Sequence, residues 1–121
     1  MNAQQLKDNL EQFSGTDGWH KFNCLYRKVL ATEGAMYLAK EAGAYWLLEM
    51  IASHRRKLIN HQGTAKLVVT DSTAVFTLTD CEAGIVATQE IPYTDFPLPE
   101  IKLYISEQED DYWSICLPSE N

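Results

Sequence analysis

Residues 66–79 read KLVVTDSTAVFTLT, and this stretch decides the fold class of the chain. Lys66 to Thr70 is rich in β-branched and apolar residues, and Asp71-Ser72 is a turn signal. After the turn, residues alternate through 74–79 with a period of two, which is typical of a strand with one buried face. The stretch therefore predicts a β-hairpin.

More strands are predicted after this hairpin. Asp80 to Gly84 forms a second turn signal, and a strand is expected over Ile85 to Ile91. Alternating patterns then recur at Ile101–Ile105 and Trp113–Leu117. The acidic run at 107–111 lies between these two patterns and predicts a solvated hairpin loop. Four or five short strands with short connections favour an antiparallel meander.

The period is about 3.6 before residue 62, as expected for helices. One amphipathic helix is predicted over Ala3–Phe13. A second begins at Thr32-Glu33 and ends or kinks at Gly43, and a third runs from Ala44 to His54. The third helix is apolar on most of its circumference, so we expect it to supply the centre of the core through Trp46, Leu47, Met50 and Ile51.

Together these patterns predict one α+β domain over residues 1–121. Residues 1–61 are mainly helical, and residues 62–121 are mainly antiparallel strands. We expect the N-terminal helices to pack on one face of a four- to five-stranded antiparallel sheet. A length of 121 residues with 45% hydrophobic residues suits one core.

The charge is unevenly divided along the chain. Residues 1–61 hold eight Lys and Arg against six Asp and Glu, a net charge of +2, whereas residues 62–121 hold two against eleven, a net charge of −9. The total of −7 makes nucleic acid an unlikely partner, because that affinity depends on Lys and Arg that neutralise phosphates.

The chain is predicted to be cytoplasmic, without a membrane segment, a metal or a cofactor. Its first residues lack a basic leader followed by an apolar stretch of secretory length. Three widely spaced cysteines, Cys24, Cys81 and Cys116, fit neither a disulfide framework nor a metal knuckle. Reduced thiols are the simplest interpretation.

Two stretches carry a resemblance to a known family. Residues 41–54 contain AGAYWLL followed by IASH, and residues 93–104 read YTDFPLPEIKLY. Both are similar to a family of small uncharacterised bacterial proteins that also occurs in phage and plasmid sequences, and the resemblance extends from about Phe13 to the C-terminal tail. It implies a bacterial or mobile-element context and a domain of unknown function, and it assigns no catalytic residue.

A small enzyme or ligand-binding domain is one hypothesis. Its pocket would lie between helices and sheet and would use Glu49, His54 and possibly Cys24. The competing interpretations are structural: Glu49 would join Ser53 and Arg56 in a local network, and His54 would belong to a solvated helix end that shares a face with His61 at a spacing of seven. Cys24, four residues after His20, would be a buried thiol.

The preferred hypothesis is a non-enzymatic protein-interaction or accessory module. Aromatic residues Tyr93, Phe96 and Tyr104 lie in or beside the proline segment 92–99, which is expected to follow the rim of the sheet. Rigid prolines beside exposed aromatics lose little entropy on binding, although the same rings could instead seal the sheet edge. The partner would be another protein or a second copy of the chain, docked at an edge that carries Trp113, Ile115 and Cys116.

Overall fold

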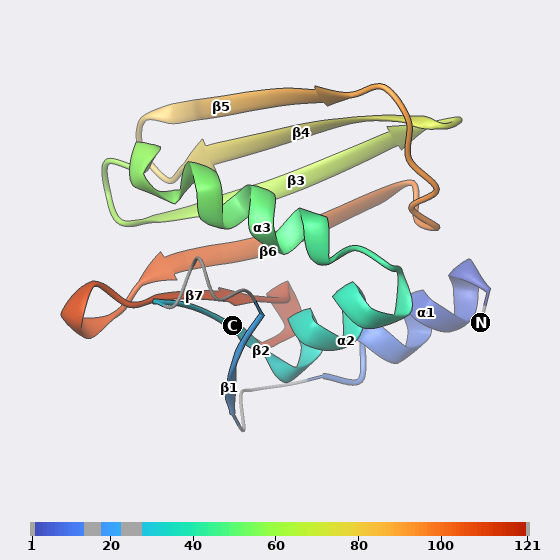
Figure 1. Cartoon of the computed structure of the whole chain (residues 1–121), viewed down its shortest axis with the longest axis horizontal. Helices are drawn as coiled ribbons and strands as arrows, with labels where there is room; N and C mark the ends of the chain where they lie inside the picture. Colours follow the sequence, from blue (N-terminus) through green and yellow to red (C-terminus); the bar gives the residue numbers. More distant parts are fainter. Residues whose placement is uncertain (1, 14–17, 23–27, 121) are drawn as a thin grey trace.

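Seven strands form one mixed sheet in the computed structural model, in the order β1-β2-β7-β6-β3-β4-β5 (Figure 1). The structure describes residues 2–13, 18–22 and 28–120. The strands are β1 (Trp19–Lys21), β2 (Val29–Thr32), β3 (Gln62–Thr70), β4 (Thr73–Asp80), β5 (Gly84–Ile91), β6 (Glu100–Glu107) and β7 (Trp113–Cys116). The helices are α1 (Ala3–Leu10), α2 (Glu33–Glu41) and α3 (Tyr45–His54), with the 3-10 turns η2 (Arg55–Lys57), η3 (Glu109–Asp111) and η4 (Pro118–Glu120).

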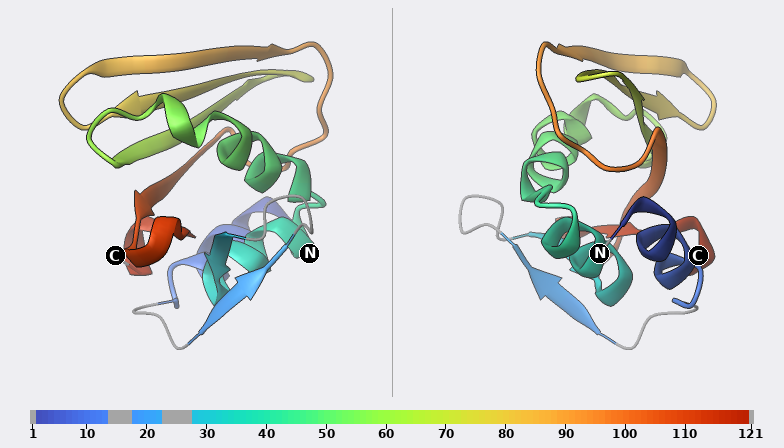
Figure 2. Two further views of the ribbon diagram at one scale, coloured as in Figure 1. Left: turned by 60° about the vertical axis from the view of Figure 1, so that its left-hand side comes forward. Right: turned by 90° about the vertical axis from the view of Figure 1, so that its right-hand side faces the viewer.

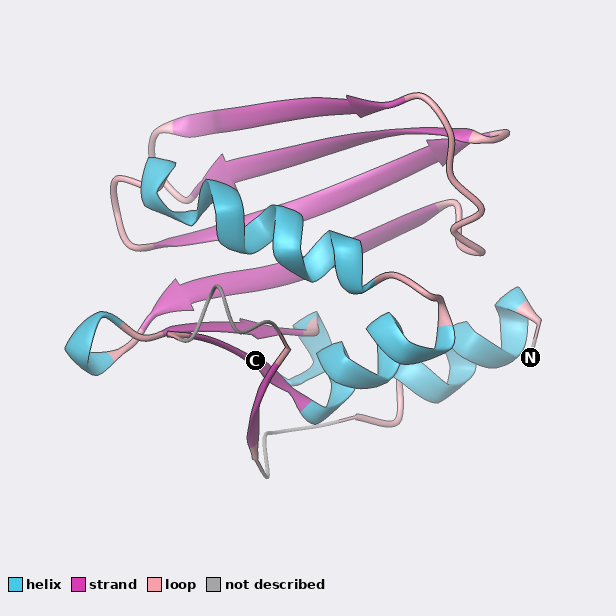
Figure 3. Cartoon of the chain, in the orientation of Figure 1, coloured by secondary structure: helices cyan, strands magenta, loops and turns pink. Residues whose placement is uncertain are grey.

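The α+β class is confirmed, but the expected four- to five-stranded antiparallel sheet is wrong in detail. Strands β3 to β7 form antiparallel pairs, as predicted, with the first hairpin turning between Thr70 and Thr73. The expected meander is wrong, because β6 pairs with β3 and not with β5. Two further strands come from the N-terminal half, and β2 pairs with β7 in parallel. Figure 3 shows how much shorter β1, β2 and β7 are than β3 to β6.

The position of β7 overturns one expectation about the sheet edges. Trp113, Ile115 and Cys116 were predicted to lie on an edge strand, yet β7 lies between β2 and β6. Ile115 is fully buried and Trp113 nearly so, because the parallel neighbour β2 covers the side that a meander would leave open. The edges of the described sheet are β1 and β5.

Local chemistry explains where α1 and α2 begin and where α2 ends. Asn2 caps α1 by accepting a hydrogen bond from the backbone N–H of Gln5 at 2.8 Å, and the Gln5 side chain accepts one from the Asn2 N–H at 3.0 Å. The Thr32 hydroxyl oxygen caps α2 by accepting from the N–H of Ala35 at 3.2 Å. Gly43 separates α2 from α3 with φ +62°, a left-handed conformation that favours glycine, so the predicted break is confirmed.

Helix α3 crosses over β3 and β6 and supplies much of the core (Figure 1). The views in Figure 2 keep α2 and α3 on one side of β3, β4 and β5. Leu47 and Ile51 are buried as predicted, but Trp46 and Met50 are only partly buried, and Leu48 is buried in their place. The apolar pattern of the helix was broad enough to hide which side faces the sheet.

Asp80 fastens two loops at one end of the sheet. Its carboxylate accepts hydrogen bonds from the backbone N–H groups of Ile59, Asn60, Glu82 and Ala83 and from the Asn60 side chain, at 2.7 to 3.0 Å. These donors, with the Asn60 side chain first, hold the pKa of Asp80 well below its usual range.

Candidate functional site

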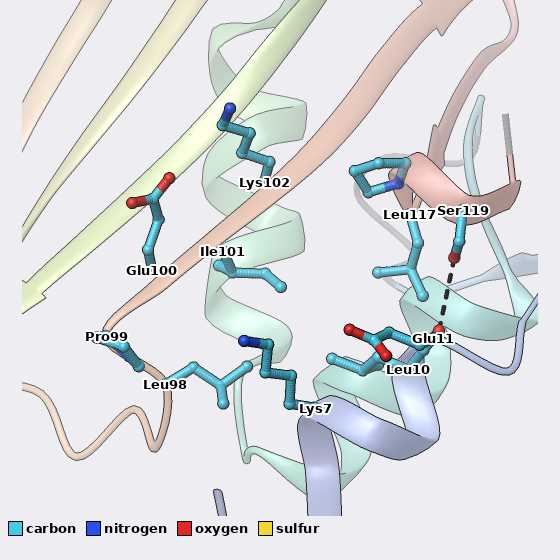
Figure 4. Close-up of a pocket in the computed structure, with 11 residues that line it drawn as sticks. Lys7, Leu10, Glu11, Leu98, Pro99, Glu100, Ile101, Lys102, Leu117 and Ser119 are labelled. Carbon is cyan, nitrogen blue, oxygen red and sulfur yellow. Dashed lines mark hydrogen bonds between the residues drawn. The ribbon is translucent and has the colours of Figure 1, made fainter. Parts of the chain in front are cut away.

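A groove with a volume of about 420 Å³ opens between α1, the beginning of β6 and the C-terminal turn η4. Figure 4 shows Leu10, Leu98, Ile101 and Leu117 converging in it from three separate segments. Lys7, Glu11 and Ser119 lie around this aliphatic floor, whereas the side chains of Glu100 and Lys102 are directed over β3, away from Leu10 and Leu117 (Figure 4). An aliphatic floor with a few polar groups around it is the usual composition of a binding site.

Helix α1 forms one wall because its apolar stripe faces inward. Leu6 and Leu10 are buried, and Lys7 and Glu11 lie beside them, exposed at the mouth of the groove. The helix is held in place by α2, since the side-chain amide of Asn9 donates a hydrogen bond to the Tyr37 hydroxyl at 2.9 Å. This hydrogen bond therefore anchors the groove wall to α2.

Strand β6 forms the opposite wall, and only half of it has a neighbour on that side. It pairs with β3 from Glu100 to Ser106, but with β7 only from Tyr104 to Glu107. The segment from Glu100 to Leu103 consequently has an open backbone edge, and that edge lines the groove.

The hydrogen-bond alternation shows which β6 groups point into the groove. The N–H of Val69 donates to the Pro99 carbonyl at 2.8 Å, and the N–H of Glu107 donates to the His61 carbonyl at 2.7 Å, so odd-numbered residues of β6 bond toward β3. The backbone N–H and C=O of Glu100 and Lys102 therefore point the other way. Within the described residues, neither N–H has a protein acceptor.

Pro118 explains why β7 stops short. The register of Tyr104 with Cys116 would place Pro118 opposite Lys102, but proline has no N–H to donate. The chain instead turns away as η4, and Leu117 closes the end of the groove.

The buried carboxylate of Glu120 holds η4 against α2. It accepts hydrogen bonds from the Thr32 hydroxyl at 2.5 Å, the N–H of Leu117 at 3.0 Å and the N–H of Gly34 at 3.1 Å. A Cβ at Gly34 would lie 2.5 Å from the Glu120 carboxylate, so glycine is required for this approach. The negative charge also lies at the N-terminus of α2, where the helix dipole favours it.

The structure separates the three predicted aromatic residues. Tyr93 is 75% exposed, as expected, and Tyr104 is half-buried on the sheet. The expectation that Phe96 is exposed is wrong: its ring is buried and packs edge-on against Trp46, with ring centroids 6.4 Å apart. The proline segment crosses the ends of β3 and β4, where the N–H of Thr94 donates to the Ser72 carbonyl at 2.7 Å, so it shields no edge strand.

Glu49 and His54 do not converge. Five residues of helix separate them, a rotation of about 140° around the axis. The His54 ring stacks on Phe76 with centroids 5.9 Å apart, and its Nε2 lies 3.1 Å from the Gln89 side-chain oxygen. Glu49 is partly buried on another side of α3.

Neither predicted side-chain arrangement around α3 is formed. Arg56 pairs with Asp111 at 3.1 Å, and the Ser53 hydroxyl donates to the Met50 carbonyl at 2.7 Å, so the expected network of Ser53 and Arg56 with Glu49 is wrong. The prediction that His54 and His61 share one face of a helix is also wrong, because α3 ends at His54.

Two of the three cysteines lie in the described part of the chain. Cys81 and Cys116 are free thiols, and Cys24 lies outside the described residues, while His20 is in a strand instead of a helix. In the described ranges, His, Cys, Asp and Glu form no cluster of three or more that could hold a metal ion. The described helices include none that is long and apolar enough to cross a bilayer.

Sequence reasoning missed the groove, because its walls come from residues 7–11, 98–102 and 117–119. One signal was present in the sequence: Pro118 directly follows the predicted strand Trp113–Leu117, and a proline cannot continue the hydrogen bonds of a strand.

Neither a curated protein nor a solved structure matches the chain significantly. The model of a family of unknown function (DUF6876) matches residues 4–121, and the chain therefore belongs to that family.

Proposed function

We propose that the chain is a non-enzymatic protein-interaction module that binds an extended segment of another protein in the groove beside β6. The segment would lie antiparallel to β6, in the position that β7 leaves at Pro118. Peptides are commonly recognised in this way, by addition of a strand to an open sheet edge.

The observation that carries the proposal is the pair of outward-facing backbone groups at Glu100 and Lys102 above an aliphatic floor. A strand edge offers main-chain hydrogen bonds to any peptide of extended conformation, and the floor then selects its side chains. Because side chains alternate along a strand, every second residue of the bound segment would face Leu10, Leu98 and Leu117. Aliphatic residues suit those positions.

The charges at the mouth define the rest of the segment. Glu100 lies 3.4 Å from the Lys66 ammonium and is partly neutralised by it. Lys7 and Glu11 on α1 are the charged side chains beside the floor, because the side chain of Lys102 is directed over β3 (Figure 4). We therefore expect alternating aliphatic and polar residues in the ligand, with an acidic residue near Lys7.

The enzyme hypothesis has less support. It needs Glu49, His54 and Cys24 in one pocket, whereas Glu49 and His54 lie on different sides of α3. The cytoplasmic location and the bacterial or mobile-element origin remain part of the proposal, supported by the free thiols Cys81 and Cys116 and by the sequence resemblance.

The test uses a library of random peptides displayed on phage, selected on the wild-type chain. Selected peptides are then measured by fluorescence anisotropy against Lys102→Pro and Lys102→Ala. Lys102→Pro removes an N–H that points into the groove and leaves the bonds from β6 to β3 intact, because odd-numbered residues make those bonds. Lys102→Ala removes the same side chain and keeps the N–H.

The proposal predicts that Lys102→Pro weakens binding by about tenfold relative to Lys102→Ala, since a peptide carbonyl loses its donor in a partly buried site. Thermal melting checks that both variants fold. Equal affinity of the selected peptides for the two variants would contradict the proposal.

A further inference from the structure

The groove beside β6 is closed at one end by the chain itself. Cys116 pairs with Tyr104, so in the same register the next residue, Leu117, takes the place opposite Leu103. Leu117 is buried, and both of its backbone groups bond to Glu120. Its N–H donates to the Glu120 carboxylate at 3.0 Å, and its carbonyl accepts from the Glu120 N–H at 3.0 Å. This end of the groove is therefore filled by anchored backbone.

The closed end determines where a bound segment can begin. A segment antiparallel to β6 runs in the same direction as β7, from Leu117 toward Pro99. Its first paired residue stands opposite Lys102, in the position that Pro118 leaves. An earlier residue in the same strand would occupy the space that Leu117 fills. An internal stretch of a protein must therefore turn sharply at this point, whereas the beginning of a chain needs no turn.

The charged side chains of α1 are ordered along the same direction. The Ser119 hydroxyl donates to the Leu10 carbonyl at 3.5 Å, so the C-terminal end of α1, with Glu11, lies at the closed end of the groove. Lys7 is one helical turn, about 6 Å, further from that end. Figure 4 shows the Glu11 carboxylate on the side of Leu117 and the Lys7 ammonium on the side away from it. Within the described chain, neither side chain forms an ion pair.

We infer that the groove takes the free N-terminus of a partner protein, with the terminal ammonium group beside Glu11. The inference rests on the proposed function, because it needs a strand added at this edge of β6. An α-amino group has a pKa of about 8 and carries its positive charge at neutral pH. One of its protons bonds to the outward carbonyl of Lys102, and the others remain for the Glu11 carboxylate. The capture of terminal amines is a known mode of peptide recognition.

The second residue of the bound segment carries the aliphatic contact. It stands opposite Ile101, so its side chain lies on the same face of the sheet as Ile101, which lines the groove with Leu10 and Leu117. The first and third residues stand opposite Lys102 and Glu100, and their side chains point to the other face. We therefore expect an aliphatic residue at the second position of the partner chain.

The charge order disfavours a captured C-terminus. A C-terminal residue reaches the closed end only if the segment runs parallel to β6, and its carboxylate would then meet the carboxylate of Glu11. In the antiparallel direction, the carboxyl end points toward Lys7 and away from the closed end. The segment is then still required to begin beside Leu117.

The experiment compares free and blocked chain ends. Two phage libraries carry the same random heptapeptides, one with a free N-terminus and one inside a loop of the coat protein, and both are selected on the wild-type chain. A peptide from the first library is synthesised with a free N-terminus, with an acetylated N-terminus, and with two glycines added before its first residue. All three forms have a C-terminal amide and a fluorophore near the C-terminal end.

Fluorescence anisotropy gives the affinity of each form for wild type, Glu11→Gln and Asp8→Asn. Asp8→Asn is the matched control, because it removes the same charge from an exposed position of α1 that does not line the groove. Acetylation and the added glycines should each weaken binding to wild type by about tenfold, since both place atoms in the space of Leu117 and acetylation also removes the charge.

The variants isolate the contribution of Glu11. Glu11→Gln should weaken binding of the free peptide by about two- to fivefold, as expected for an exposed ion pair, and should leave the acetylated peptide unchanged. Asp8→Asn should change neither. Equal effects of the two variants on the free peptide would overturn the role of Glu11.

Equal affinity of the free, acetylated and extended peptides for wild type, or equal recovery of binders from the two libraries, would overturn the inference. Lys102→Pro would still weaken such binders relative to Lys102→Ala if the segment adds a strand to β6, so the proposed function is judged separately. A selection that yields no binder from either library would overturn both.

Discussion

Removal of the Glu120 carboxylate should destabilise the fold through the contacts that hold η4. Glu120→Ala leaves the N–H groups of Gly34 and Leu117 buried without an acceptor, and it removes the partner of the Thr32 hydroxyl. Each buried orphan donor costs about 1 to 3 kcal/mol, partly offset because the variant no longer buries a carboxylate. We expect a loss of about 2 to 4 kcal/mol in the free energy of unfolding.

Urea titration measures this loss, with Ser119→Ala as the matched control in the same turn. Ser119 is exposed and its hydroxyl donates only a long 3.5 Å hydrogen bond to the Leu10 carbonyl. The free energy of unfolding of Ser119→Ala should therefore differ from that of wild type by nearly zero. The loss for Glu120→Gln should lie between those of Ser119→Ala and Glu120→Ala, because the amide keeps one acceptor oxygen but places its NH2 group next to a hydrogen-bond donor. A loss below about 0.5 kcal/mol for Glu120→Ala would refute the reasoning, since two orphaned donors cannot cost so little.

Three further outcomes follow from the same structure. Leu47→Ala should lower the free energy of unfolding by about 2 to 5 kcal/mol in a denaturant titration, because truncation of a buried side chain leaves a cavity. A change within error of zero would contradict the place of Leu47 in the core. Because the pKa of Asp80 is lowered in the folded state, its carboxylate stabilises the fold at pH values above its pKa in the unfolded chain, and this stabilisation is lost as pH falls toward the folded-state pKa. The melting temperature of Asp80→Asn should therefore fall less steeply than that of wild type from neutral to acid pH. Parallel melting temperature curves for the two proteins would argue against the clamping of the loops by Asp80. Burial, with a smaller contribution from Glu120, raises the pKa of Cys116 to about 11. Iodoacetamide near pH 8 should therefore label the exposed Cys81 before Cys116, as followed by mass spectrometry. Equal labelling rates for the two thiols would contradict the raised pKa of Cys116.

The local elements could be predicted because their signals are local. The hairpin at Asp71-Ser72 and the break at Gly43 each depend on a few adjacent residues, and both are present. Strands β1 and β2 have only three and four residues, too few for a period of two to be recognised. The parallel pairing of β2 with β7 joins residues far apart in the chain, and no turn signal marks it.

The candidate site was harder to predict for the same reason. Aromatic residues in the proline segment suggested an exposed surface, but Phe96 turns inward because the segment crosses the strand ends above the core. The groove depends on where β7 stops relative to β6, which is a property of register. Pro118 marks that point in the sequence, but its partner Lys102 is identified only by the pairing.

Amide hydrogen exchange of the chain with and without a selected peptide tests the central proposal most directly. The free chain should exchange quickly at Glu100 and Lys102, whose N–H groups face the groove, and slowly at Ile101 and Leu103, which bond to β3. A saturating peptide should slow exchange at Glu100 and Lys102 and leave the other two unchanged. If the Lys102 amide still exchanges at its free rate in the complex, the peptide does not add a strand to β6, and the account of the groove is wrong.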